Sequence, residues 1–223
     1  MASGVHVRNH TSVLAAAEKR ALIWIAERLP RRVNSDHLSA LGLTAMGGAG
    51  LAFWYARHNP AAGAALVVLA LALNWFGDSL DGTVARVRNQ QRPRYGYYVD
   101  HVIDLAGTAM LFAGLAASGF MTPMIATLVV AAFFLVSAEA YLATHARGVF
   151  TMAFMGVGPT ELRILLAAGA VFLINSPVVN PFGLGEVRLF DLGGAIGAAG
   201  MVTAFLITSS ANIRALYIEE TRR

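Results

Sequence analysis

Residues 61–118 read AAGAALVVLALALNWFGDSLDGTVARVRNQQRPRYGYYVDHVIDLAGTAMLFAGLAAS and contain two long apolar segments joined by a short basic loop. The segments, 61–85 and 95–118, each reach the roughly 20 residues that a helix needs to cross a bilayer. Four aspartates lie at the loop ends of these segments: Asp78, Asp81, Asp100 and Asp104. The predicted fold and the predicted chemistry both follow from this arrangement.

The composition of the whole chain agrees with a membrane protein. Of its 223 residues, 57% are hydrophobic and only 13% are charged, whereas a soluble domain carries about 25% charged residues. The chain has no cysteine, which excludes disulfides and thiolate metal sites. Its net charge of +4 could indicate nucleic-acid binding in a soluble protein. Here the charges flank apolar segments, so we expect a lipid bilayer as the partner and no nucleic acid.

Six apolar segments follow one another, separated by loops that contain proline or glycine; they cover residues 37–57, 61–85, 95–118, 123–146, 160–176 and 189–213. Before them, residues 12–29 place apolar side chains at helical spacing but interrupt them with charges, which is typical of a helix lying in the membrane interface. We therefore expect an all-α integral membrane protein with six transmembrane helices preceded by an N-terminal amphipathic interfacial helix. The tail and this helix (1–33) precede one transmembrane domain (34–223).

The basic residues predict the orientation of this topology. If the N-terminus is cytoplasmic, all 17 lysines and arginines fall on the inner side except Arg57 and Arg188. This distribution satisfies the positive-inside rule for six spans with both termini in the cytoplasm. The four aspartates then also lie toward the cytoplasmic side.

The four aspartates need compensation, because a carboxylate at membrane depth costs roughly 2.5–3.5 kcal/mol even on lenient scales. Asp78 and Asp81 are three residues apart, and Asp100 and Asp104 are four apart, so each pair shares a helix face. On antiparallel neighbouring helices these faces can converge on one point. Clustered carboxylates suit hard divalent cations such as Mg²⁺ or Mn²⁺, and two such ions would suit phosphoryl chemistry. The spacing alone also permits a structural network with nearby arginines or an ion-coupled membrane transporter.

The segment from Asp78 to Asp104 resembles the signature of the CDP-alcohol phosphotransferase (CDP-alcohol phosphatidyltransferase) family. Eight positions match in order and at permitted spacing: Asp78, Asp81, Gly82, Ala85, Arg86, Gly96, Asp100 and Asp104. The resemblance implies a membrane enzyme of phospholipid biosynthesis, in which an alcohol attacks the β-phosphorus of a CDP-alcohol and CMP leaves. It also implies dependence on divalent metal, and family members are commonly homodimers.

Residue roles carry over from the resemblance. Asp78, Asp81 and Asp100 would be metal ligands, and Asp104 would be the general base and a possible ligand of the second ion. Gly82, Ala85, Arg86 and Gly96 would contact the CDP moiety. Ser35-Asp36-His37-Leu38-Ser39 stands where the family has a Pro-Asn/Asp-x-x-Thr element, so Asp36 is a further candidate for that moiety. Asp36 can equally belong to a helix start.

The family includes two donor classes, and the sequence favours one of them modestly. The compact six-span size resembles bacterial enzymes that use CDP-diacylglycerol with a small alcohol acceptor, which would lie in the inner (cell) membrane with a cytoplasmic active site. His101 after Asp100, and Gly158-Pro159-x-Glu161, instead resemble CDP-aminoalcohol (choline or ethanolamine) phosphotransferases, which act on a diradylglycerol.

An acceptor pocket is predicted on the same cytoplasmic side. Polar residues near the inner ends of the fourth and fifth segments are its candidates: Glu139, Arg147, Glu161 and Arg163, accompanied by Tyr141, His145 and Thr160. Each also has a simpler interpretation, because arginines anchor inner helix ends and Thr160-Glu161 can open a helix after proline.

Overall fold

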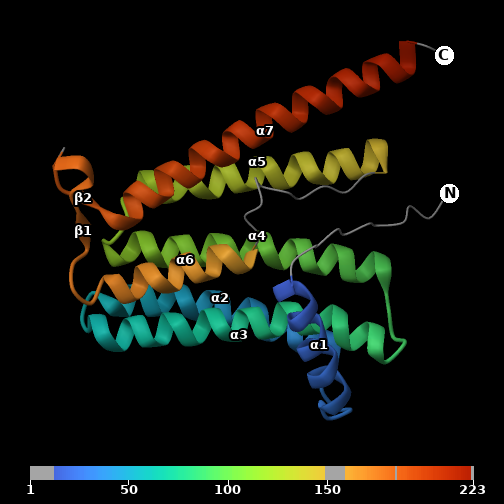
Figure 1. The fold of residues 1–223 in the computed structure, drawn as a ribbon, viewed down its shortest axis with the longest axis horizontal. Helices are drawn as coiled ribbons and strands as arrows, with labels where there is room; N and C mark the ends of the chain where they lie inside the picture. The colour runs from blue at the N-terminus through green and yellow to red at the C-terminus, as the bar shows by residue number, and fades with distance from the viewer. Residues whose placement is uncertain (1–12, 149–158, 184, 222–223) are drawn as a thin grey trace.

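The computed structural model describes residues 13–148, 159–183 and 185–221 (Figure 1). The predicted tail before residue 13 and Gly158 lie outside these ranges. The described elements, in chain order, are α1 (Val13–Arg28), α2 (Ser35–Ala56), α3 (Pro60–Val87), α4 (Pro93–Ser118), α5 (Pro123–Arg147), α6 (Pro159–Phe172), β1 (Val178–Val179), η1 (Pro181–Gly183), β2 (Val187–Arg188) and α7 (Leu189–Thr221). The two short strands pair as an antiparallel hairpin.

Proline and glycine set most of the helix boundaries. Pro60, Pro93 and Pro123 are the first residues of α3, α4 and α5, where the missing N–H of proline is not needed for a helical hydrogen bond. Gly119 and Gly148 directly follow α4 and α5, and their φ angles of 82° and 68° lie in the left-handed region. Glycine adopts this conformation without the steric cost that a Cβ would add.

Five helices in the described ranges are long and apolar enough to cross a membrane: α2, α3, α4, α5 and α7. The observed bounds follow the predicted segments closely except at the end of α7, which was predicted at residue 213 and lies at Thr221; the all-α membrane fold is supported at this level. The fifth predicted segment differs, because α6 has only 14 residues. At 1.5 Å per residue it is about 21 Å long, too short to cross a hydrocarbon core of roughly 30 Å by itself.

The end of α6 explains its difference from the predicted segment 160–176. The helix stops at Phe172, and the amide of Asn175 then bonds to the Phe172 carbonyl at 3.1 Å, which closes a tight turn. Ser176 and Pro177 follow, and neither favours continuing a helix. The predicted segment ran on to residue 176 because most residues of the turn are also apolar, and hydropathy alone does not distinguish a turn from a helix.

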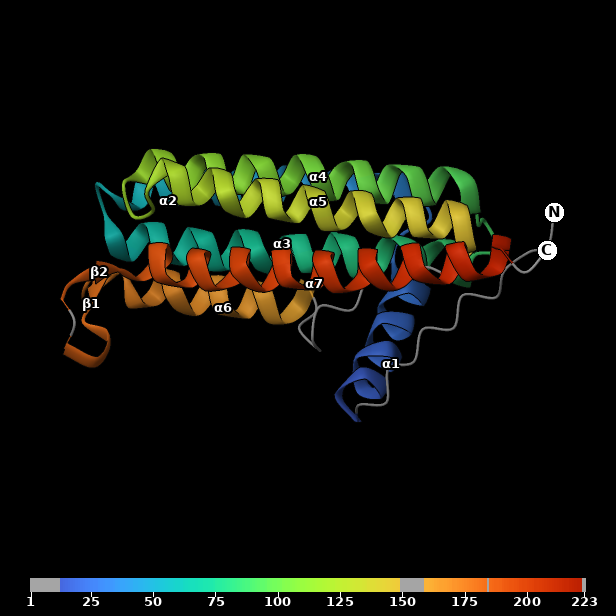
Figure 2. The same ribbon diagram turned by 90° about the horizontal axis from the view of Figure 1, so that it is seen from above.

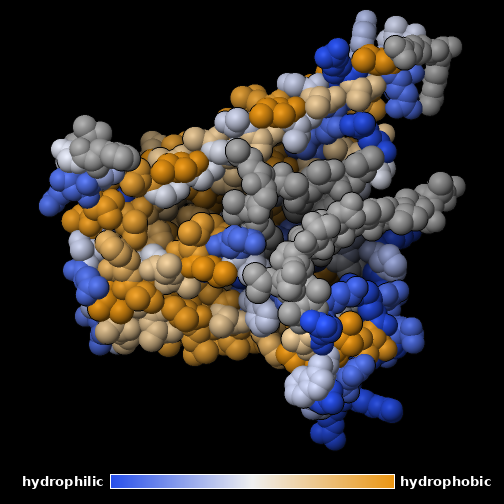
Figure 3. Space-filling view, viewed as in Figure 1, coloured by the Kyte–Doolittle hydropathy of each residue, from blue (hydrophilic) through white to orange (hydrophobic). Residues whose placement is uncertain are grey.

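The long helices run side by side along one direction (Figures 1 and 2). Helix α6 lies along α3 over part of its length, and α7 packs on α5 but leans away toward its C-terminal end. The α3–α4 connection lies at the same end of the bundle as the C-terminal ends of α5 and α7. Figure 3 shows hydrophobic side chains over α3 and α6, and hydrophilic side chains near α1.

Helix α1 crosses the bundle instead of joining it, as both ribbon views show. Ala26 of α1 is buried with Leu80 and Val84 of α3, and the Trp75 indole N–H donates to a Glu18 carboxylate oxygen at 3.0 Å. Arg88 donates to the backbone carbonyls that follow α1, including that of Leu29 at 2.9 Å. These contacts anchor a helix at the predicted place; its position in the membrane interface remains a prediction.

Glycines bring α3 and α4 unusually close to α2. A Cβ added to Gly114 of α4 would lie 2.2 Å from the Gly50 carbonyl oxygen of α2. A Cβ added to Gly77 of α3 would lie 2.6 Å from the Leu38 carbonyl oxygen of α2. Both helices that carry the aspartates are therefore positioned by backbone contact with α2, in the way that small residues allow in membranes.

Two glycines of α2 give a matched test of this packing. Gly50→Ala would place a Cβ 2.5 Å from the Met110 carbonyl oxygen, whereas a Cβ at Gly48 meets nothing within 4 Å. We expect Gly50→Ala to lower the free energy of unfolding by about 1–3 kcal/mol through overpacking. Gly48→Ala should match or exceed the wild type, because alanine favours a helix over glycine by about 1 kcal/mol. Thermal unfolding in detergent measures both, and equal losses would contradict the packing account.

Candidate active site

The structure brings the four aspartates together on two neighbouring helices. Helix α3 carries Asp78 and Asp81, and the antiparallel helix α4 carries Asp100 and Asp104. Asp104 lies close enough to the other three carboxylates to interact with them electrostatically, and Asp81 interacts in the same way with Asp78 and Asp100. The arrangement concentrates negative charge within the membrane-spanning bundle and requires a compensating cation.

Arg163 of α6 supplies one such cation. Its Nη2 donates to an Asp78 carboxylate oxygen at 2.7 Å, and its Nε donates to the Asn74 side-chain oxygen at 2.7 Å. Asn74 is buried and donates in turn to the Gly42 carbonyl of α2 at 2.9 Å. Sequence reasoning assigned Arg163 to an acceptor pocket and missed Asn74, although a lone amide in an apolar run is a signal of a buried polar contact.

Asp81 is held by hydrogen bonds from two directions. The Ser39 hydroxyl of α2 donates to one carboxylate oxygen at 2.6 Å, and the backbone N–H of Gly82 donates to the other. Ser39 is buried and ends the Ser35–Ser39 element that the family resemblance singled out. This element therefore reaches the acidic cluster through Ser39.

The donor set fits a hard divalent cation in its chemistry, because all four groups are carboxylates. In the described ranges, however, no three Asp, Glu, His or Cys side chains are arranged to hold a metal ion. Asp78 is bonded to Arg163, and both oxygens of Asp81 are bonded to protein donors.

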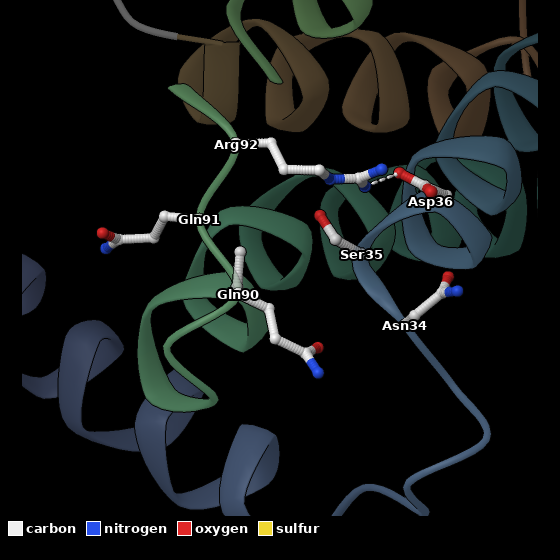
Figure 4. Close-up of a pocket in the computed structure, with 7 residues that line it drawn as sticks. Asn34, Ser35, Asp36, Gln90, Gln91 and Arg92 are labelled. Atoms are coloured by element: carbon white, nitrogen blue, oxygen red, sulfur yellow. Dashed lines mark hydrogen bonds and ion pairs between the residues drawn. The ribbon is translucent and has the colours of Figure 1, made fainter. Parts of the chain in front are cut away.

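A polar cavity of about 400 Å³ opens where α2 begins and α3 meets α4 (Figure 4). It is lined by Asn34, Ser35, Asp36, Ala85, Gln90, Gln91 and Arg92. Arg92 forms an ion pair with Asp36 across it. Two predicted CDP contacts, Asp36 and Ala85, thus line one cavity. The loop residues Gln90, Gln91 and Arg92 were missed, because the sequence does not reveal that the α3–α4 connection folds back beside α2.

The other predicted CDP contacts lie near this cavity without lining it. The Arg86 guanidinium donates to the Thr83 hydroxyl at 3.0 Å, and it would lie 3.2 Å from a Cβ on Gly82. Glycine at 82 therefore leaves room for the Arg86 side chain. A Cβ on Gly96, in the first turn of α4, would meet nothing within 4 Å, so space around Gly96 is open to a ligand.

The predicted acceptor residues fall in separate places. Glu139 accepts a hydrogen bond from the Asn212 amide of α7, and Arg147 donates to the Asn212 side-chain oxygen. This contact joins α5 to α7, whereas Arg163 joins α6 to the aspartates. Glu161 is exposed on α6. The sequence offered no reason to pair Asn212 with α5, because the contact depends on how α7 packs.

Comparison with known proteins identifies the family of this architecture. The family model for CDP-alcohol phosphatidyltransferase matches residues 38–208, a range that includes every motif residue from Asp78 to Asp104. A search of curated protein sequences finds no significant match to the chain.

The Arg163–Asp78 contact can be tested through stability. Arg163→Gln removes the cation next to a carboxylate that is only 30% exposed, so we expect a loss of about 1–3 kcal/mol in unfolding free energy. Adding Asp78→Asn should recover part of that loss, because the uncompensated charge disappears. Thermal unfolding with a metal chelator present would measure the cycle. If the double variant is no more stable than Arg163→Gln, the loss of unfolding free energy comes from the Arg163–Asn74 hydrogen bond and not from the ion pair with Asp78.

Proposed function

Because the chain belongs to the CDP-alcohol phosphatidyltransferase family, we propose that it transfers a phosphatidyl group from CDP-diacylglycerol to the hydroxyl of a small alcohol and releases CMP. The reaction would take place at the cytoplasmic side of the membrane. The observation that carries this proposal is the position of the polar cavity relative to the aspartates, along one side of α3.

The cavity and the acidic cluster lie at successive turns of α3. Ala85, which lines the cavity, is four residues from Asp81 and seven from Asp78. At 1.5 Å per residue these separations are about 6 and 10 Å along the helix axis. A nucleotide seated in the cavity would therefore extend its diphosphate toward the aspartates. Arg92 lines the cavity and Arg86 follows Ala85 in α3; both can form charge-assisted hydrogen bonds with phosphate oxygens.

The aspartates divide the chemistry between them. Asp78, Asp81 and Asp100 would hold Mg²⁺ or Mn²⁺, which supplies charge neutralisation for the diphosphate. Ser39 orients Asp81 for this role through its hydrogen bond. Asp104 accepts the proton of the acceptor hydroxyl as the acceptor oxygen bonds to phosphorus and the phosphate oxygen of CMP departs with the bonding electrons.

The surroundings of Arg163 favour a substrate with a lipid tail. Arg163 points toward Asp78, while its neighbours Leu162, Ile164 and Leu165 are 45%, 62% and 64% exposed on α6. In a bilayer these large apolar side chains would contact lipid. A phosphatidyl group could thus keep its acyl chains in the membrane while its headgroup reaches the cluster.

The direct test is CMP release from defined donors. The purified protein in lipid discs would receive Mg²⁺ or Mn²⁺, one donor and one acceptor, with an Asp81→Asn variant as the inactive control. We expect metal-dependent CMP from CDP-diacylglycerol, and a new lipid whose mass identifies the acceptor. CMP only from CDP-choline or CDP-ethanolamine, with a diradylglycerol as acceptor, would overturn the donor assignment. CMP from neither donor class would overturn the transferase proposal.

Asp104→Asn tests the assignment of the base. We expect turnover to fall by at least about 100-fold, because an amide cannot take the proton of the acceptor, while CDP-diacylglycerol binding stays within twofold. Turnover comes from CMP release, and donor binding from thermal stabilisation by the donor. Glu186→Gln, an exposed change in the β hairpin connection, is the control and should leave both unchanged. Near-normal turnover of Asp104→Asn would show that Asp104 is not the general base.

A further inference from the structure

Two buried hydroxyls on α5 lack a hydrogen-bond partner in the described part of the chain: those of Ser137 and Tyr141. They are four residues apart and therefore share one helix face. The Ser137 side chain is only 1% exposed, and neither hydroxyl lies in hydrogen-bonding geometry with another group of the described residues. Buried polar groups are nearly always paired, so these two hydroxyls are open to a hydrogen bond with a ligand.

The Tyr141 hydroxyl lies beside the acidic cluster. It is close enough to Asp104 and Asp100 to interact with them electrostatically. The ring is fixed by α4, since it packs edge-on against His101 with centroids 4.8 Å apart, and against Tyr97 at 6.5 Å. His101 is itself buried and bonded to the Tyr97 carbonyl at 2.6 Å. Tyr141 is thus held in place by its ring, with its hydroxyl on the Asp104 side.

The opposite face of α5 has a different role. Glu139 is two residues from both Ser137 and Tyr141, which places it about 200° around the helix from each of them. Glu139 pairs with Asn212 of α7. The polar residues of α5 therefore divide into a face that joins α7 and a face, formed by Ser137 and Tyr141, that approaches Asp104. Only the second face has unsatisfied hydroxyls.

The location of the donor cavity indicates which substrate this second face would meet. The cavity is built from α2, α3 and the α3–α4 connection, whereas Tyr141 approaches the cluster from α5, with Ser137 one helical turn away on the same face. Asp104 is also the motif aspartate farthest along α4 from that connection. A donor in the cavity would leave the α5 side of Asp104 to the second substrate, whose hydroxyl must lie next to this carboxylate.

We propose that the hydroxyls of Ser137 and Tyr141 bind the acceptor alcohol and direct its attacking oxygen toward Asp104. This inference rests on the proposed transfer reaction. The ligand class is a molecule with a free hydroxyl, whose oxygens can accept from Tyr141 and donate to or accept from Ser137. The sequence analysis already placed Tyr141 with the acceptor-pocket candidates, whereas Ser137 was missed.

The test compares Tyr141→Phe and Ser137→Ala with the wild type in the CMP-release assay. The acceptor is whichever of glycerol 3-phosphate, serine or inositol supports turnover. Loss of one neutral hydrogen bond should raise the KM for the acceptor roughly 3- to 10-fold, while the KM for CDP-diacylglycerol changes less than twofold. Tyr98→Phe, which removes a hydroxyl from a residue that is 70% exposed on α4, is the matched control and should change neither value.

A stability measurement separates ligand binding from a structural role. Because the Tyr141 hydroxyl has no hydrogen-bond partner among the described residues, Tyr141→Phe should keep or raise the unfolding temperature without substrates, and it should lose the stabilisation that the acceptor gives the wild type. Unchanged acceptor KM in both variants of an active enzyme would overturn this inference alone. So would equal rises in the KM of both substrates. A wild-type protein that releases no CMP would overturn the proposed function and this inference with it.

Discussion

The structure depends on how four carboxylates are kept inside an apolar helix bundle. A single charged side chain at the centre of a membrane helix is already unfavourable by several kcal/mol, and these four also repel one another. Arg163 bonds directly to Asp78, and Ser39 bonds to Asp81. The cluster thus draws its partners from α2 and α6, so helices far apart in sequence must pack around α3 and α4 for the charges to be tolerated.

Close backbone packing makes this compensation possible. At Gly77 and Gly114 the helices α3 and α4 approach the α2 backbone more closely than any side chain would permit. The first of these crossings lies next to Asp78, and the Asn74 amide bonds to the Gly42 carbonyl at the same place. The register of α2 against α3 therefore sets where Ser39 meets Asp81 and where the polar cavity forms. The fold and the candidate site share the same contacts.

The sequence predicted the elements better than their contacts. Hydropathy, prolines and glycines located most helix ends within a few residues, because these signals are local, but α7 continues to Thr221, well beyond the predicted end at residue 213. The length of α6 was wrong, since its end is decided by a turn inside an apolar run. The family was predicted from the eight motif positions and is confirmed by the family match. Asn74, Asn212 and Ser137 were missed because their importance arises only when helices distant in sequence pack together.

The positions of the predicted acceptor residues also depend on contacts between helices that are distant in sequence. From sequence, every polar residue near the inner ends of α5 and α6 could face one cavity. The observed packing separates Arg163 at the aspartates from Glu139 and Arg147 at α7, and it packs the Tyr141 ring against His101 of α4. Helical periodicity distinguishes these faces, but only the packing of α4 and α7 shows which face meets the site.

The measurement that tests the central claim most directly is Mn²⁺ binding to the purified protein, followed by electron paramagnetic resonance with and without CDP. The account predicts that the wild type binds Mn²⁺, and that the double variant Asp81→Asn/Asp100→Asn loses it while remaining folded. It also predicts that Asp36→Asn in the polar cavity retains Mn²⁺ but responds less to CDP. A wild type that binds no Mn²⁺, or a double variant that binds it equally well, would contradict the assignment of the metal site to the aspartate cluster.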